Sequence, residues 1–92
     1  MPKFLIEVPH EADAIACARV VKIFLSSGSH FLTNAEWGCW DGDHHCWMIV
    51  DVNDKQEARA IVPPAFRAQA RTVQLNRFSL EKINAFLRQH GG

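Results

Sequence analysis

The sequence lacks the features of a membrane protein, a secreted protein or a nucleic-acid-binding protein. No apolar run approaches the roughly 20 residues that a transmembrane helix needs. The N-terminus has no basic segment leading into a long apolar run, so a secretory signal peptide is not indicated. Ten basic residues balance ten acidic residues, so no net charge attracts nucleic acid or anionic lipid. We therefore expect neither a nucleic acid nor a membrane as a partner.

Cysteine is sparse, with only Cys17, Cys39 and Cys46 in the chain. An odd number of cysteines argues against a disulfide framework. The chain also lacks a Cys-x-x-Cys pair, the spacing by which many zinc sites are recognised. We therefore expect reduced thiols and a cytoplasmic location. Cys17 falls on the apolar face of a predicted helix and is interpreted as a small core residue. Two catalytic motifs are also missing, the glycine-rich phosphate loop and the Gly-x-Ser-x-Gly nucleophile turn.

What the sequence does contain is the material for one globular domain, residues 1–92. Its 92 residues are 48% hydrophobic and 22% charged, a composition that can supply a core. At this size a second subunit would help to bury a sheet.

Hydrophobic periodicity predicts four strands and three helices. The predicted strands cover residues 3–8, 30–40, 43–52 and 72–78, and the predicted helices cover 11–27, 54–62 and 79–87. Asp41-Gly42 is a favoured two-residue turn between the second and third strands. Asp54 and Ser79 are expected to cap the second and third helices, and Pro63-Pro64 to end the second.

The order of these elements predicts an α+β fold of the ferredoxin-like βαββαβ type. Such a fold has a four-stranded antiparallel sheet with two helices on one face, and here an additional C-terminal helix follows. We expect the first strand to lie between the third and fourth strands, antiparallel to both.

Three segments resemble an uncharacterised bacterial family within the superfamily of dimeric α/β barrels. They are Ile6-Glu-Val-Pro-His-Glu11, Gly28-Ser-His-Phe-Leu32 and Pro63-Pro-Ala-Phe-Arg67. The order of elements, which covers nearly the whole chain, resembles the small proteins of this superfamily and implies a homodimer whose sheets pack face to face. The superfamily includes isomerases and monooxygenases, so the resemblance indicates a fold rather than an activity.

Alternation along the predicted hairpin sends the adjacent histidines His44 and His45 to opposite faces of the sheet. Phe4, Ile6 and Val8 are expected to face the helices, as are Val73 and Leu75. Polar side chains on the open face then suggest a pocket for a small organic molecule, enclosed by a second copy of the chain. The predicted catalytic residues are His45, Glu7 and Glu36, with proton transfer centred on His45. The predicted ligand-binding residues are Trp47, Asn34, Thr72, Gln74, Asn76, His10 and Arg71.

Two other interpretations stay open for these side chains. The polar groups of the open face could form a satisfied network at a non-catalytic dimer interface, with His10 and Arg71 as solvated loop residues. On the helix side, Cys39, His44 and Cys46 could bind a transition metal such as zinc, with His10 or a water as fourth ligand. Because the recognised zinc spacings are missing, the main expectation is that no cofactor is bound.

Overall fold

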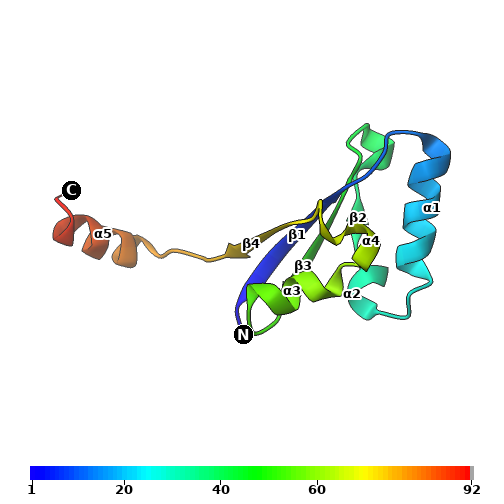
Figure 1. Ribbon diagram of the computed structural model, residues 1–92. Coiled ribbons are helices and arrows are strands. Elements are labelled where there is room, and N and C mark those ends of the chain that lie inside the picture. Colours follow the sequence, from blue (N-terminus) through cyan, green and yellow to red (C-terminus); the bar gives the residue numbers. More distant parts are fainter. Residues whose placement is uncertain (92) are drawn as a thin grey trace.

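The computed structural model describes residues 1–91, which form one sheet with helices around it (Figure 1). In chain order the elements are β1 (Lys3–Pro9), α1 (Ala14–Leu25), α2 (His30–Thr33), β2 (Glu36–Trp37), the 3₁₀ turn η1 (Cys39–Asp41), β3 (His45–Asp51), α3 (Lys55–Ile61), α4 (Pro64–Arg67), β4 (Arg71–Leu75) and α5 (Leu80–Gln89). The sheet order is β2-β3-β1-β4, and all neighbouring strands are antiparallel. The α+β class, the four-stranded antiparallel sheet and the position of β1 between β3 and β4 are confirmed.

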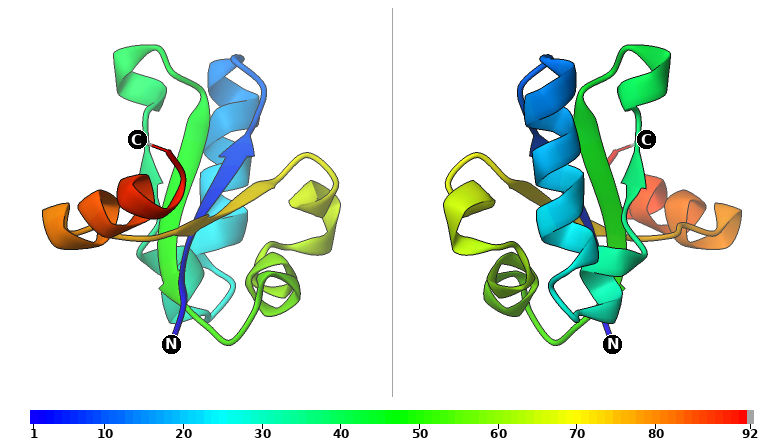
Figure 2. Two further views of the ribbon diagram at one scale, coloured as in Figure 1. Left: turned by 90° about the vertical axis from the view of Figure 1, so that its left-hand side faces the viewer. Right: turned by 90° about the vertical axis from the view of Figure 1, so that its right-hand side faces the viewer.

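The core lies between the sheet and the helices α1 to α4, all on one side of it (Figure 1). The right-hand view of Figure 2 looks onto this helix layer, and the left-hand view looks onto the opposite face, with α5 in the foreground. Alternate residues of β1 and β3 point into the core, as a half-buried strand requires. The buried cluster consists of Phe4, Ile6, Val8, Val20, Phe24, Leu32, Cys46, Met48, Val50, Val52, Ala58 and Val62. No helix within residues 1–91 combines the length and the apolar character needed to cross a membrane.

Short polar side chains begin the helices, as the sequence predicted at two positions. An Asp54 carboxylate oxygen accepts a hydrogen bond from the Glu57 backbone N–H at 2.7 Å, and the Ser79 hydroxyl accepts one from Lys82 at 3.1 Å. These bonds satisfy backbone donors that the first helical turn leaves free. The first helix begins later than predicted, at Ala14, because Asp13 caps it in the same way.

The strand predicted over residues 30–40 is wrong in its first half, where the chain forms the short helix α2. After α1 ends at Leu25, Gly28 adopts a left-handed conformation with φ of 81°. The Ser29 hydroxyl then accepts a hydrogen bond from the Leu32 N–H at 3.4 Å, and the Asn34 side-chain amide donates to the His30 carbonyl at 2.7 Å. These local bonds stabilise a helical turn against the β-propensity of the segment, so β2 retains only Glu36 and Trp37.

The hairpin between β2 and β3 has the predicted register but not the predicted turn. Trp37 pairs with Cys46, yet the chain passes through η1 instead of a two-residue turn at Asp41-Gly42. Two backbone N–H groups, those of Asp41 and Asp43, donate to the Gly38 carbonyl, each at 3.0 Å. Because Cys39 is in this wider connection, its side chain does not follow the alternating directions of a regular strand.

The expected orientation of β4 is also wrong. Thr72 lies opposite Ile6 and Gln74 opposite Phe4, and residues directly opposite each other in an antiparallel pair share a face. Thr72 and Gln74 therefore lie on the helix side, whereas Val73 and Leu75 lie on the open face. The cause is the pairing register with β1, which the alternation within residues 72–78 does not encode.

Gly38 generates the first prediction, because a β-carbon at this position would lie 2.6 Å from the Asp43 carbonyl oxygen and 2.9 Å from the Trp47 ring. We expect Gly38→Ala to lower the free energy of unfolding by about 1–3 kcal/mol, the usual cost of overpacking. Denaturant unfolding measures this loss. The control is Gly42→Asn, since Gly42 has open space around it and a left-handed φ of 82° that asparagine tolerates. Equal losses for both variants would contradict the steric explanation.

Candidate functional site

Four cysteine and histidine side chains, residue types that can ligate a metal ion, converge from four separate segments at one end of the sheet. They are His10 in the loop after β1, Cys17 in α1, Cys39 in η1 and His44 just before β3. One ligand atom from each residue can be chosen so that all four atoms lie within 4.8 Å of one another. We call these four residues the Cys/His cluster.

Local structure explains why the two histidines of the cluster meet. The His10 backbone N–H donates to the His44 carbonyl at 3.0 Å, which prolongs the β1–β3 pairing by one step beyond Pro9 and His45. His10 and His44 are thus opposite each other and share the helix-side face. Their rings stand edge to face with centroids 5.7 Å apart.

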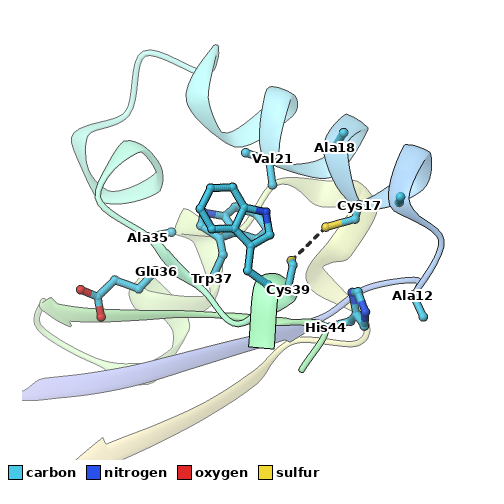
Figure 3. Close-up of a pocket in the computed structure, with 11 residues that line it drawn as sticks. Ala12, Cys17, Ala18, Val21, Ala35, Glu36, Trp37, Cys39 and His44 are labelled. Atoms are coloured by element: carbon cyan, nitrogen blue, oxygen red, sulfur yellow. Dashed lines mark hydrogen bonds between the residues drawn. The ribbon is translucent and has the colours of Figure 1, made fainter. Parts of the chain in front are cut away.

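The two cysteines approach this pair from the helix layer. Cys17 is on the stripe of α1 that also carries the buried Val20 and Phe24, at the end of the helix near His10. The turn η1 brings Cys39 toward α1, so that the two sulfur atoms face each other (Figure 3). Cys17 is buried as predicted, but its thiol contacts polar donors rather than the apolar core.

The distances within the cluster are those of a compact donor set. His10 Nε2 lies 3.2 Å from the Cys17 sulfur and 3.1 Å from the Cys39 sulfur, and the two sulfurs are 2.9 Å apart. That separation is too long for a disulfide bond of about 2.05 Å, and both cysteines are free thiols. In a tetrahedral zinc site, neighbouring ligand atoms lie roughly 3.3–3.8 Å apart, as bond lengths of about 2.0–2.3 Å require. An ion would therefore need the sulfurs to separate by less than about 1 Å.

Burial favours the uncharged forms of two residues of the cluster, Cys39 and His10. It raises the pKa of the Cys39 thiol to about 11, helped by the hydrogen bond with Cys17. It also lowers the pKa of His10, together with the neighbouring His44 and His45, so the neutral imidazole with its free lone pair is favoured. The Nδ1 atoms of His10 and His44 are both buried without a hydrogen-bond partner within residues 1–91. Imidazole nitrogen atoms beside two thiols are a donor set that fits a metal ion, which would hold the thiols as thiolates.

A cavity of about 920 Å³ leads to the cluster between α1 and the segment from β2 to η1 (Figure 3). Small apolar side chains of α1 form one wall, and Trp37 and Trp40 belong to the other. The full lining is Ala12, Ala14, Cys17, Ala18, Val21, Ala35, Glu36, Trp37, Cys39, Trp40 and His44. An ion could reach the thiols through this cavity without unfolding of the core.

A second group of polar side chains lies on the open face, where the sequence predicted proton-transfer chemistry. His45 Nε2 is 3.7 Å from a Glu7 carboxylate oxygen, and the Trp47 indole N–H donates to the other Glu7 oxygen at 3.3 Å. The His45 ring stacks on Trp47 with centroids 5.7 Å apart, and its Nδ1 contacts the Asp43 carboxylate. Arg71 lies opposite Glu7 in the β1–β4 pairing.

The third predicted catalytic residue and several predicted ligand-binding residues do not join this group. Glu36, predicted as catalytic, pairs with Trp47 across the β2–β3 ladder but is exposed. Asn34 instead ends α2 and bonds to its backbone. Thr72 and Gln74 lie on the opposite face of the sheet, and Asn76 is exposed after the end of β4. The predicted pocket wall is thus split between two faces, and His10 belongs to the Cys/His cluster.

The predicted metal ligands need one replacement. Cys39 and His44 are in the cluster. His10, predicted as an alternative to water for the fourth ligand, is in the cluster too. Cys46 is not part of the cluster, because it is fully buried in the core beside Val8. The sequence did not predict Cys17 as a ligand, because its position depends on how α1 is rotated against the sheet. Its only signal in the sequence is its nearness to His10 along the chain.

A scan against protein-family models found no matching family, and searches of curated proteins and of solved structures found no significant match.

The contrast between Cys46 and the cluster gives a prediction about thiol reactivity. Burial raises the pKa of Cys46 to about 12, and alkylation requires the thiolate. We expect iodoacetamide to modify Cys46 at pH 8 about a thousandfold more slowly in the folded protein than in urea, where the pKa is about 8.5. The rate in the folded protein should keep rising from pH 8 to pH 10, whereas in urea it levels off. Peptide mapping by mass spectrometry measures both, and equal rates would contradict the core position of Cys46.

Proposed function

We propose that this chain binds a transition-metal ion, Zn²⁺ in particular, through His10, Cys17, Cys39 and His44. The observation that carries the proposal is the convergence of four donors from four segments, with all four ligand atoms within 4.8 Å of one another. Two thiolates and two imidazoles are a common ligand set of four-coordinate zinc, and this set is too soft to favour magnesium or calcium.

Core packing alone does not account for this arrangement. Cys46 provides the comparison, because it has the environment of an ordinary buried cysteine among apolar side chains. Cys17 and Cys39 instead contact each other and the same imidazole nitrogen. This mutual contact of two sulfurs and an imidazole nitrogen, with His44 beside them, is a donor set that a metal ion can complete.

A bound ion would join the end of β1, the helix α1, the turn η1 and the start of β3. Such a link would strengthen this end of the sheet, where β2 contributes only two residues. Metal binding would then contribute directly to folding free energy. The site requires reduced thiols, which makes a cytoplasmic location part of the proposal.

A second candidate function rests on the contacts among Glu7, His45 and Trp47 on the open face. We propose that this group binds a small organic molecule, and that His45 transfers a proton while Glu7 orients its ring. The fold and the partner belong to this proposal: a ferredoxin-like sheet whose open face is enclosed by a second copy. Support comes from the antiparallel order β2-β3-β1-β4 and from the resemblance to dimeric α/β barrels. The helix α2 lies in the segment predicted as the second strand, and this is a departure from the simple ferredoxin-like pattern.

Metal content tests the first proposal. We expect one zinc ion per chain in tag-free protein purified without added metal, measured by native mass spectrometry and elemental analysis. Cys17→Ser and Cys39→Ser should each weaken zinc binding by more than about 100-fold, since even residues that only support a ligand contribute up to about 100-fold. Cobalt(II) added to metal-free protein should show thiolate-to-metal charge-transfer bands, which both substitutions reduce.

Matched controls separate the cluster from the rest of the chain. Cys46→Ala should retain the ion, because Cys46 is outside the cluster. His45→Ala should retain it too, whereas His44→Ala should weaken binding, although the two histidines are adjacent in the chain. Metal-free wild-type protein that takes up no zinc or cobalt, or equal losses in His44→Ala and His45→Ala, would exclude the site.

Native mass spectrometry also tests the second candidate. We expect an organic adduct on wild-type protein from cells, and its loss in both His45→Ala and Glu7→Gln. Asn34→Ala is the control, because Asn34 ends α2 and is separate from the group. An adduct that persists in His45→Ala would remove this histidine from the binding site, and the absence of any adduct on wild-type protein would count against the proposal.

A further inference from the structure

Helix α5 is amphipathic and stands apart from the rest of the molecule (Figure 1). Its apolar side chains Ile83, Phe86 and Leu87 follow the spacing of one helix face. Their exposed fractions are 37%, 57% and 44%, and no α5 residue within 1–91 is buried. A helix of 10 residues is marginal in water without tertiary packing. This apolar face therefore requires a partner surface.

The overall dimensions agree with a missing partner. The radius of gyration is 16.7 Å, whereas a compact chain of this length has about 12 Å. The accessible surface is 6619 Å², and a compact monomer of 10.4 kDa exposes about 5,400 Å². The excess of roughly 1,200 Å² per chain is in the range that a stable dimer buries, at about 800 Å² or more per partner.

The open face of the sheet offers a matching surface. Ile49, Leu5 and Val73 lie side by side in the paired strands, and Leu75 extends the apolar strip along β4. Ile49 is 62% exposed. This apolar strip lies at the end of the sheet from which α5 departs, while Glu7, His45 and Trp47 occupy the opposite end.

We propose that α5 of each protomer packs on the apolar strip of a second copy, in a reciprocal exchange. The apolar face of α5 and the apolar strip are each unpartnered in one chain, and a two-fold dimer pairs both at once in a closed arrangement. α5 lies on the same side of the sheet as the open face but is held away from it (Figures 1 and 2), as an arm that reaches to a neighbour would be.

Charge favours a second copy over a membrane surface. The chain carries no net charge, so two copies meet without net repulsion. α5 contains Glu81 together with Lys82 and Arg88, which is not the strongly basic polar face that anionic lipid attracts. The exchanged helices cover the apolar strip and leave the polar group around His45 at the other end. This inference does not depend on metal binding at the Cys/His cluster.

The mass of the full-length protein in solution tests the exchange. We expect sedimentation equilibrium to give twice the chain mass for the wild type. Ile83→Lys on α5 and Ile49→Lys on the sheet should each raise the dimer dissociation constant by about 1,000-fold or more. Each dimer contains the substitution twice, and a central interface residue contributes about 30-fold per site. Both positions are exposed in the single chain, so the core of the variants should stay folded by circular dichroism.

Glu81→Lys is the control, because it adds more positive charge to α5 but on the side opposite Ile83. It should leave the dimer intact. A wild-type monomer at 100 µM, a concentration roughly 100-fold above a micromolar dissociation constant, would overturn the proposal. A dimer that survives Ile83→Lys would show sheet contacts without α5. A dimer broken by Ile83→Lys but not by Ile49→Lys would show pairing between two α5 helices. Either result would also reject the exchange.

Discussion

The alternation of side chains along the paired strands β1 and β3 determines where the polar chemistry of this chain is located. Opposite residues of the pair share a face, and each successive residue changes face. At one end of the pair this rule sends His10 and His44 to the helix side and Glu7, His45 and Trp47 to the open side. One residue of slippage would exchange the two groups and bury the wrong set, so the apolar core residues of β1 and β3 fix both sites.

Features set by neighbouring residues could be predicted from the sequence, and features set by distant contacts could not. The caps at Asp54 and Ser79 and the opposite directions of His44 and His45 follow from local rules. The helix α2 was missed because hydrogen bonds of Ser29 and Asn34 outweigh the β-propensity of residues 30–35. The face of β4 depends on its register with β1, which is a non-local pairing. The place of Cys17 depends on the rotation of α1.

The three cysteines show how the fold places one residue type in two chemical environments. Cys46 is surrounded by apolar side chains and keeps its proton well above neutral pH. Cys17 and Cys39 also lie in partly dehydrated surroundings, but their sulfurs contact each other and an imidazole nitrogen. Burial and the hydrogen bond with Cys17 raise the pKa of the Cys39 thiol to about 11. A divalent cation would favour the thiolate instead, because it stabilises the negative charge on the sulfur.

The small size of the packed body gives the proposed metal ion and the proposed second copy a common purpose, which is added stability. Without α5 and its connection, the body ends with β4 at Leu75, and a core in a chain of about 75 residues supplies only about 3–5 kcal/mol of stability. Short domains compensate with metals, disulfides or oligomerisation. Here the cysteines are free, while the Cys/His cluster lies at one end of the sheet and the apolar strip at the other. An ion would hold the end where β2 is short, and a partner's α5 would cover the end that the chain's own helices leave open.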